Sequence, residues 1–177
     1  EAASSPMFTP VEELTDAQKK GALKCRMSYT IKRPELGETK GKAKARLVAK
    51  DLKAIYKRDR QETYAATPTV EGFRLVVAST DVEAGDELSS TDFDTAFLQA
   101  FRWKGKLMLI VFRDPFLNKD VYEWIDGVIY GMQTGGADWK NTLGYMLSTE
   151  MGFKEVKNME SIYYHPGRHI TVPCHVD

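Results

Sequence analysis

The chain has 177 residues, 42% of them hydrophobic and 28% charged, which is enough to bury the core of one ordinary domain and excludes a broadly disordered protein. The longest uninterrupted apolar run, Leu107 to Phe112, has six residues, against the roughly 20 that a membrane-spanning helix needs. We therefore expect a soluble globular chain with no membrane span.

The net charge of zero conceals an uneven distribution. Residues 19–60 hold 15 Lys and Arg against four acids, a local net charge of +11, whereas residues 61–177 hold 10 basic and 17 acidic residues, a net charge of −7. This asymmetry predicts one face for polyanions and another for cations or partners. An ordinary solvated basic surface is the alternative.

The two cysteines, Cys25 and Cys174, lie far apart in the sequence and match no metal-binding spacing. They predict reduced thiols and a reducing intracellular compartment, such as the cytoplasm, the nucleus or an organelle. The sequence starts with Glu1 and a small, polar segment, which is compatible with removal of a transit peptide or with a piece of a longer gene product. The compartment itself is not predicted.

In chain order, Thr15 and Gln18 form a capping-box pattern that predicts a short helix from Asp16 to about Ala22. Two alternating runs follow, "KCRMSYTIKR" and "KAKARLVAK", separated by the turn formers of "PELGETKG". They predict an antiparallel hairpin with one apolar face and one cationic face. The second strand places four cations on the latter, at about 7 Å spacing along the strand: Lys42, Lys44, Arg46 and Lys50.

The second half alternates helices and strands. Thr69 is predicted to cap a helix that runs to about Thr80, with an apolar inner side made of Val70, Phe73, Val76 and Val77. The remaining predicted elements are a strand over residues 87–93, a helix from Thr95, strands in "GKLMLIVF" and "VYEW", a helix from Asp138 to near Gly152, and a hairpin in "SIYYHPGRHITVPCHV".

This order of elements is no βαβ succession, so it predicts an α+β fold with antiparallel sheets backed by helices. The sequence contains no Gly-rich phosphate loop, nucleophile elbow or Cys/His zinc pattern.

The aspartates offer a different chemistry. Asp92 ends one predicted strand and Asp177 follows another, and carboxylates on neighbouring strands hold hard divalent cations for phosphoryl transfer. The alternative is that Asp92 or Asp94 only caps the helix that follows.

Four ordered motifs carry a resemblance to a known family: "KARLVAKD" at 44–51, "TDFDTAFLQA" at 91–100, "VIYGMQTGGADW" at 128–139 and the final "HVD". Together they resemble the reverse transcriptase of copia-type LTR retrotransposons. That family has Lys-Ala-Arg-Leu-Val-Ala-Lys-Gly, then Asp-Val-Lys-Thr-Ala-Phe-Leu, then Leu-Tyr-Gly-Leu-Lys-Gln-Ala-Pro-Arg-Ala-Trp, then Tyr-Val-Asp-Asp. The resemblance covers roughly residues 22–177.

The resemblance implies the fingers and palm of a right-hand polymerase fold. It implies an N-terminal arm with a short helix at 1–21, a fingers-like basic hairpin and helix at 22–84, and the first palm strand and helix at 85–103. Fingers-like strands at 104–137 and a palm helix with the terminal hairpin at 138–177 complete it.

The resemblance also implies an RNA-directed DNA polymerase that uses two Mg²⁺ ions on an RNA or DNA primer–template. Asp92 and Asp177 match catalytic, metal-binding aspartates, and the carbonyl of Phe93 is a further implied metal ligand. The implied nucleotide-binding residues are Lys44, Arg46, Lys50, Phe97 and Gln133, where Phe97 matches the aromatic residue that obstructs a ribose 2′-hydroxyl. Core packing is the alternative role of Phe97.

The sequence departs from the family at several positions. The family's Gln-Ala-Pro-Arg is Thr134 to Ala137 here, the Lys two residues after Asp92 is Asp94, and no second aspartate follows Asp177. We therefore expect that these 177 residues do not polymerise nucleotides unaided. Two other functions stay open: a truncated, recruited fold that serves as a non-catalytic structural subunit of a larger protein assembly, and a module that binds nucleic acid through the basic hairpin.

Overall fold

The computed structural model describes residues 8–11, 13–34, 39–52, 63–101 and 107–176. The chain divides into two compact units, and each consists of two stretches of sequence. The first unit comprises residues 1–58 and 102–135, and the second comprises residues 59–101 and 136–177. The α+β class is confirmed, with sheets backed by helices in place of a βαβ succession.

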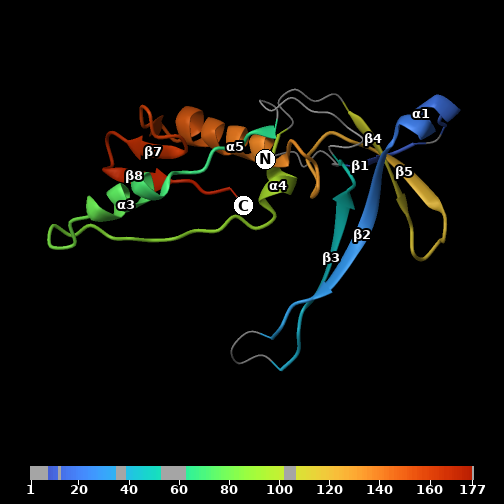
Figure 1. The fold of residues 1–177 in the computed structure, drawn as a ribbon, viewed down its shortest axis with the longest axis horizontal. Coiled ribbons are helices and arrows are strands. Elements are labelled where there is room, and N and C mark those ends of the chain that lie inside the picture. The colour runs from blue at the N-terminus through green and yellow to red at the C-terminus, as the bar shows by residue number, and fades with distance from the viewer. Residues whose placement is uncertain (1–7, 12, 35–38, 53–62, 102–106, 177) are drawn as a thin grey trace. The chain divides into compact units, whose positions relative to one another are not determined.

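A five-stranded sheet forms the first unit, in the order β1-β5-β4-β2-β3 (Figure 1). All its pairings are antiparallel except that of β2 with β4, which is parallel over two residue pairs and departs from the expected wholly antiparallel sheet. Its strands are β1 (Phe8–Pro10), β2 (Leu23–Ile31), β3 (Ala43–Ala49), β4 (Met108–Arg113) and β5 (Asp120–Ile125). Ile110 and Ile125 are fully buried at its centre.

Helix α1 (Asp16–Gly21) leads into β2 and has the capping box that the sequence predicts. The Thr15 hydroxyl accepts from the Gln18 amide at 3.3 Å, and Gln18 Oε1 accepts from the Thr15 amide at 2.9 Å. The predicted boundaries are therefore correct, because both signals are local in sequence.

Strands β2 and β3 form a long two-stranded ribbon, in which Cys25 lies opposite Ala49 and Ile31 opposite Ala43. Only Leu23 and Lys24 of β2 also pair with β4, so from Cys25 onward the two strands leave the rest of the sheet (Figure 1). The predicted hairpin and its two faces are confirmed by this register. The burial of β3 differs from the expected half-buried strand, since Ala43 and Ala45 are exposed whereas Lys44 and Arg46 are half-buried.

The backbone of the segment after β5 lies close against the end of β3, at the base of this ribbon. Tyr130 forms a parallel bridge with Val48, and its carbonyl accepts from the Ala49 amide at 2.7 Å. Gly131 follows with a φ of +85°, and a Cβ atom there would collide with the Ala49 carbonyl oxygen and lie 2.8 Å from Val48 Cγ1. Only glycine tolerates both the left-handed backbone and the missing space.

The second unit holds helices α3, α4 and α5 and a three-stranded antiparallel sheet, in the order β6-β7-β8. Its strands are β6 (Lys154–Glu155), β7 (Ile162–His165) and β8 (Ile170–Pro173), and its helices are α3 (Val70–Ala78), α4 (Ala96–Gln99) and α5 (Gly135–Tyr145). A π-helical turn, Met146–Glu150, extends α5. The predicted terminal hairpin is confirmed as β7 and β8.

The core of the second unit combines apolar and aromatic side chains with the buried hydroxyls of Thr142 and Ser161. Trp139, Ile162 and Tyr163 are buried. The Ser161 hydroxyl, 1% exposed, donates to the Ala66 carbonyl at 2.8 Å and so fixes the segment before α3 to the start of β7.

Helix α3 confirms one prediction and corrects another. Thr69 caps it, because its hydroxyl accepts from the Gly72 amide at 3.0 Å. The predicted inner side is wrong, since Val70 and Phe73 are 60% and 53% exposed and Gly72 is the buried residue of the helix. Gly72 allows close packing, because a Cβ atom there would lie 2.9 Å from Ile162 Cδ1.

Two further predictions are wrong. Residues 87–93 are exposed and form no strand, because this segment lacks an alternating apolar face that could pair with a neighbour. The helix expected from Asp138 begins earlier, at Gly135, and Asp138 lies in its first turn.

No helix in the described ranges has the length and apolar character that crossing a membrane requires.

We predict that Gly131→Ala destabilises the protein by more than about 2 kcal/mol, since it adds left-handed backbone strain to a collision with β3. Gly85→Ala is the control: Gly85 also has a positive φ, +94°, but a Cβ atom there meets nothing within 4 Å. We expect it to cost only about 1–2 kcal/mol. Urea unfolding followed by circular dichroism measures both, and equal losses would contradict the assigned approach.

Candidate nucleic-acid interface

The β2–β3 ribbon carries its cations on one face. Residues directly opposite each other in an antiparallel pair share a face, so the register assigns the side chains without ambiguity. The hydrogen bonds from Lys50 N to Lys24 O and from Lys32 N to Lys42 O extend this register at both ends. The basic face consists of Lys24, Arg26, Lys32, Lys42, Lys44, Arg46 and Lys50, together with Ser28, Thr30 and Val48.

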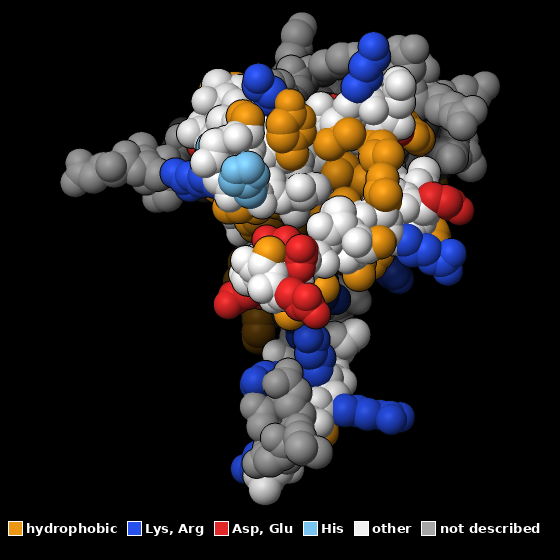
Figure 2. All heavy atoms as spheres, turned by 90° about the vertical axis from the view of Figure 1, so that its left-hand side faces the viewer, with side chains coloured by type: hydrophobic (Ala, Val, Ile, Leu, Met, Phe, Trp, Pro, Cys, Tyr) orange, Lys and Arg blue, Asp and Glu red, His pale blue; other side chains and the backbone are white. Residues whose placement is uncertain are grey.

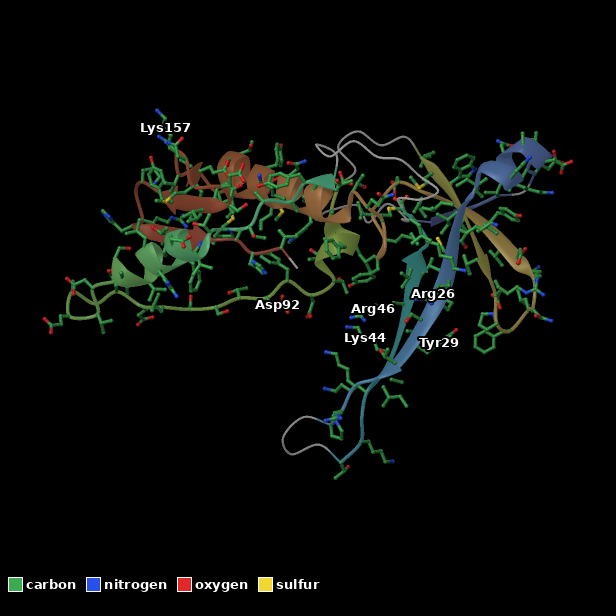
Figure 3. All side chains as sticks on the ribbon, viewed as in Figure 1. Arg26, Tyr29, Lys44, Arg46, Asp92 and Lys157 are labelled. Carbon is green, nitrogen blue, oxygen red and sulfur yellow. The ribbon has the colours of Figure 1, made fainter. Side chains whose placement is uncertain are left out.

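This basic face contains no acidic side chain, so its charge is not neutralised from within. Five of its cations are exposed, and Lys44 and Arg46 are half-buried. Figure 3 shows Lys44 and Arg46 on the side of the ribbon opposite Tyr29. Alternate residues on a strand are about 7 Å apart, which matches the spacing of successive phosphates in an extended nucleic-acid strand.

The other face of the ribbon is apolar, and the exposure of its side chains increases from the base to the tip. Cys25 and Ala49 are buried at its base, whereas Tyr29 and Ile31 are 62% and 79% exposed toward its tip. The sequence predicts this alternation but not the exposure of Tyr29 and Ile31, because alternation identifies a face without showing what covers it.

Arg46 is held against an aromatic ring. Its guanidinium carbon lies 5.2 Å from the centroid of the Tyr130 ring, a cation–π contact between β3 and the segment that follows β5. Tyr130 belongs to the third of the four motifs, but the sequence alone did not single it out.

Four of the five predicted nucleotide-binding residues belong to the first unit: Lys44, Arg46, Lys50 and Gln133. The Gln133 side chain donates to Asp51 Oδ1 at 3.0 Å, and the Gln133 amide donates to Asp51 Oδ2 at 3.1 Å. Asp51 is only 5% exposed and was missed as a site residue, since its partner lies 82 positions away.

The predicted metal-binding segment lies in the second unit. Asp92 and Phe93 are exposed and lie outside any helix or strand, and Phe97 is half-buried in α4. The Phe93 ring packs edge-on against Trp139, with 5.3 Å between centroids. The Phe101 amide donates to the buried Thr142 hydroxyl at 2.8 Å, so both ends of this segment are attached to α5.

Asp94 does not cap α4 in the expected way. The N-cap of α4 is Thr95, which has a left-handed φ of +55° and makes no side-chain capping bond. The Asp94 carbonyl instead accepts from Gln99 Nε2 at 2.7 Å. This bond links the last residue of α4 to the residue before its N-cap.

No group of three or more His, Cys, Asp or Glu side chains in the described ranges is arranged to hold a metal. Asp177, the second predicted catalytic aspartate, lies outside the described residues. The metal-binding roles of Asp92, Phe93 and Asp177 therefore stay predictions.

Both cysteines are free thiols, as expected, and each is protected by its surroundings. Burial raises the pKa of Cys25 to about 11, against an opposing effect of Lys50. Burial and the nearby Glu155 raise the pKa of Cys174 to about 11. Burial, with Glu155 and Cys174 nearby, raises the pKa of Tyr163 to about 12.

Comparison with family models, with curated proteins and with solved structures gives no match for this chain.

We predict that Cys25 and Cys174 react slowly with iodoacetamide in the folded protein until the pH approaches 11, because only the thiolate is nucleophilic. A folded-state pKa above the ordinary 9.0 stabilises the fold fully below pH 9 and ceases to do so as the pH rises through 11. Mass spectrometry of alkylated native and urea-unfolded protein measures the rates. Equal rates at pH 8 would contradict the burial of both thiols.

Proposed function

We propose that the chain comprises fingers and palm portions of a reverse transcriptase of the copia type, and that its basic face binds the phosphates of a nucleic acid. The observation that supports binding is the register of β2 and β3, which places seven Lys and Arg on one face of a ribbon with no acid among them. The four ordered motifs support the lineage, and the first of them, residues 44–51, contributes Lys44, Arg46 and Lys50 to this face.

The physical basis is the release of counterions. Each phosphate that a Lys or Arg neutralises frees condensed cations, so the affinity falls steeply as salt rises. A cationic face on a ribbon recognises a backbone and not a base sequence, so we expect binding to depend little on sequence.

Catalysis remains the second part of the proposal. Asp92 and Asp177 would supply carboxylates for Mg²⁺, which would lower the pKa of a primer hydroxyl and stabilise the leaving pyrophosphate. Asp92 is exposed on a segment attached to α5, a position open to ligands. Primer extension with Mg²⁺ or Mn²⁺ by a chain extended beyond Asp177 tests this part: activity that Asp92→Asn abolishes would support it, and no nucleotide incorporation would contradict it.

We predict that Lys44→Ala and Arg46→Ala each weaken binding of a fluorescein-labelled 30-nucleotide oligo(U) about 3- to 10-fold at low salt. Each also lowers the slope of log K against log salt by about 0.7, the value for one lost contact to a single strand. Fluorescence anisotropy from 25 to 200 mM KCl measures both quantities.

The matched control is Lys157→Ala, which removes an exposed Lys from the second unit (Figure 3). It lowers the net charge by the same amount but leaves the basic face intact. Equal effects of Lys157→Ala and Lys44→Ala would show that net charge, and not the basic face, attracts the oligonucleotide.

A second candidate function, a non-catalytic subunit of a protein assembly, is favoured by α3. Three of its apolar side chains are at least half-exposed, at 60% for Val70, 53% for Phe73 and 54% for Leu75. Figure 2 shows apolar side chains, in orange, on the face of the second unit that is turned to the viewer. Exposed apolar area of this kind commonly marks a protein interface.

We predict for this candidate that the tagged chain, isolated from its native source, elutes in a complex that Phe73→Ser disrupts. Val82→Ser is the control, because Val82 is 74% exposed but lies in the turn beyond α3. Size-exclusion chromatography with light scattering gives the mass of each species. A free monomer from the native source would exclude the subunit role and leave nucleic-acid binding untouched.

A further inference from the structure

A buried carboxylate lies at the base of the basic ribbon. Asp51 follows β3 and is 5% exposed, and a charged group at such a position is costly unless hydrogen bonds replace its water. Gln133 supplies two of these bonds, from its amide at 3.1 Å and from its side chain at 3.0 Å. These two bonds fasten the end of β3 to a segment that follows β5.

The fastened segment runs beside β3 residue by residue. Tyr130 bridges Val48 and accepts from the Ala49 amide, and Gly131 lies against the Ala49 carbonyl. Gln133 then closes the contact on Asp51. The bonds of Asp51 therefore lie at one end of a continuous contact whose other end is Tyr130.

Tyr130 is the residue on which Arg46 rests. The Arg46 guanidinium lies over its ring, and Arg46 Nε is buried without a hydrogen-bond partner in the described part of the chain. The contact limits the rotamers of a long side chain, and a cation whose rotamer is already limited loses less entropy when it binds a phosphate.

We propose that Asp51 and Gln133 are positioning residues, which hold Tyr130 under Arg46 and so direct the guanidinium of Arg46 toward phosphate. The proposal rests on the proposed binding of nucleic acid by the basic face. At both positions this chain departs from the family motifs that it resembles, since Asp51 stands where they have Gly and Gln133 where they have Lys.

The sign of one mutational effect separates positioning from simple electrostatics. Asp51 carries a negative charge beside a cationic face, so electrostatics alone predicts that Asp51→Ala tightens the binding of a polyanion. Positioning predicts the reverse, because the substitution removes both bonds to Gln133.

We expect Asp51→Ala to weaken binding of the labelled oligo(U) about 2- to 10-fold at 50 mM KCl, the loss that freeing one long side chain explains. Asp51→Asn is the control. Its amide oxygen accepts one bond, and the Gln133 amide group can turn to accept the other, so we expect binding at least as tight as that of the wild type.

Coupling identifies the residue through which Asp51 acts. In an Arg46→Ala background, we expect Asp51→Ala to cause no further loss of affinity. In a Lys44→Ala background, where the altered cation lies on the same face but away from Tyr130, we expect the full loss. An additive loss in both backgrounds, or tighter binding by Asp51→Ala alone, would overturn the proposal.

Circular dichroism melting shows whether each variant folds. If Asp51→Ala does not fold, Gln133→Ala removes the side-chain bond and keeps the backbone bond, and we expect the same coupling to Arg46 at smaller size. If Arg46→Ala and Lys44→Ala each leave the affinity for oligo(U) unchanged, the proposed function is refuted. If both variants weaken binding but Asp51→Ala shows no coupling to Arg46→Ala, only the positioning role is refuted.

Discussion

The antiparallel register between β2 and β3 is the constraint on which the first unit depends. A slip of β2 by one residue would move each of its side chains to the other face and bury Lys24 or Arg26 where Cys25 now lies. Burial of Cys25 and Ala49 at the base of the ribbon therefore fixes the place of the cations at its exposed end. Apolar packing at the base of the ribbon thus determines which of its faces carries positive charge toward the tip.

In the second unit, α5 has the corresponding role. Trp139 packs against Phe93, and Thr142 accepts from the Phe101 amide while donating to the Asp138 carbonyl at 2.8 Å. Asp92 itself lies outside any helix or strand, so these contacts on either side of it attach its segment to α5. Any chemistry at Asp92 depends on a helix that begins more than 40 residues later, at Gly135.

The sequence predicted the features whose causes are local. The capping box at Thr15, the cap at Thr69 and the alternation of both ribbon strands are each decided within a few residues. The predictions failed where contacts with residues distant in sequence determine the structure. The buried side of α3 follows from the packing of Gly72 against Ile162. Asp51 bonds to Gln133, which lies 82 positions away. The cationic residues of the site were therefore predictable, and their support was not.

Beyond the Val48–Tyr130 bridge, toward its tip, the ribbon pairs with no third strand in the described part of the chain, so both its edges there present backbone groups to solvent. Such edges invite a strand from another copy, and like charges on the approaching ribbons oppose that encounter. The same lysines and arginines that suit phosphates thus guard against self-association. Salt screens both the attraction of these cations to phosphates and the repulsion between two ribbons. At high ionic strength the ribbon therefore releases nucleic acid and is also most prone to aggregate.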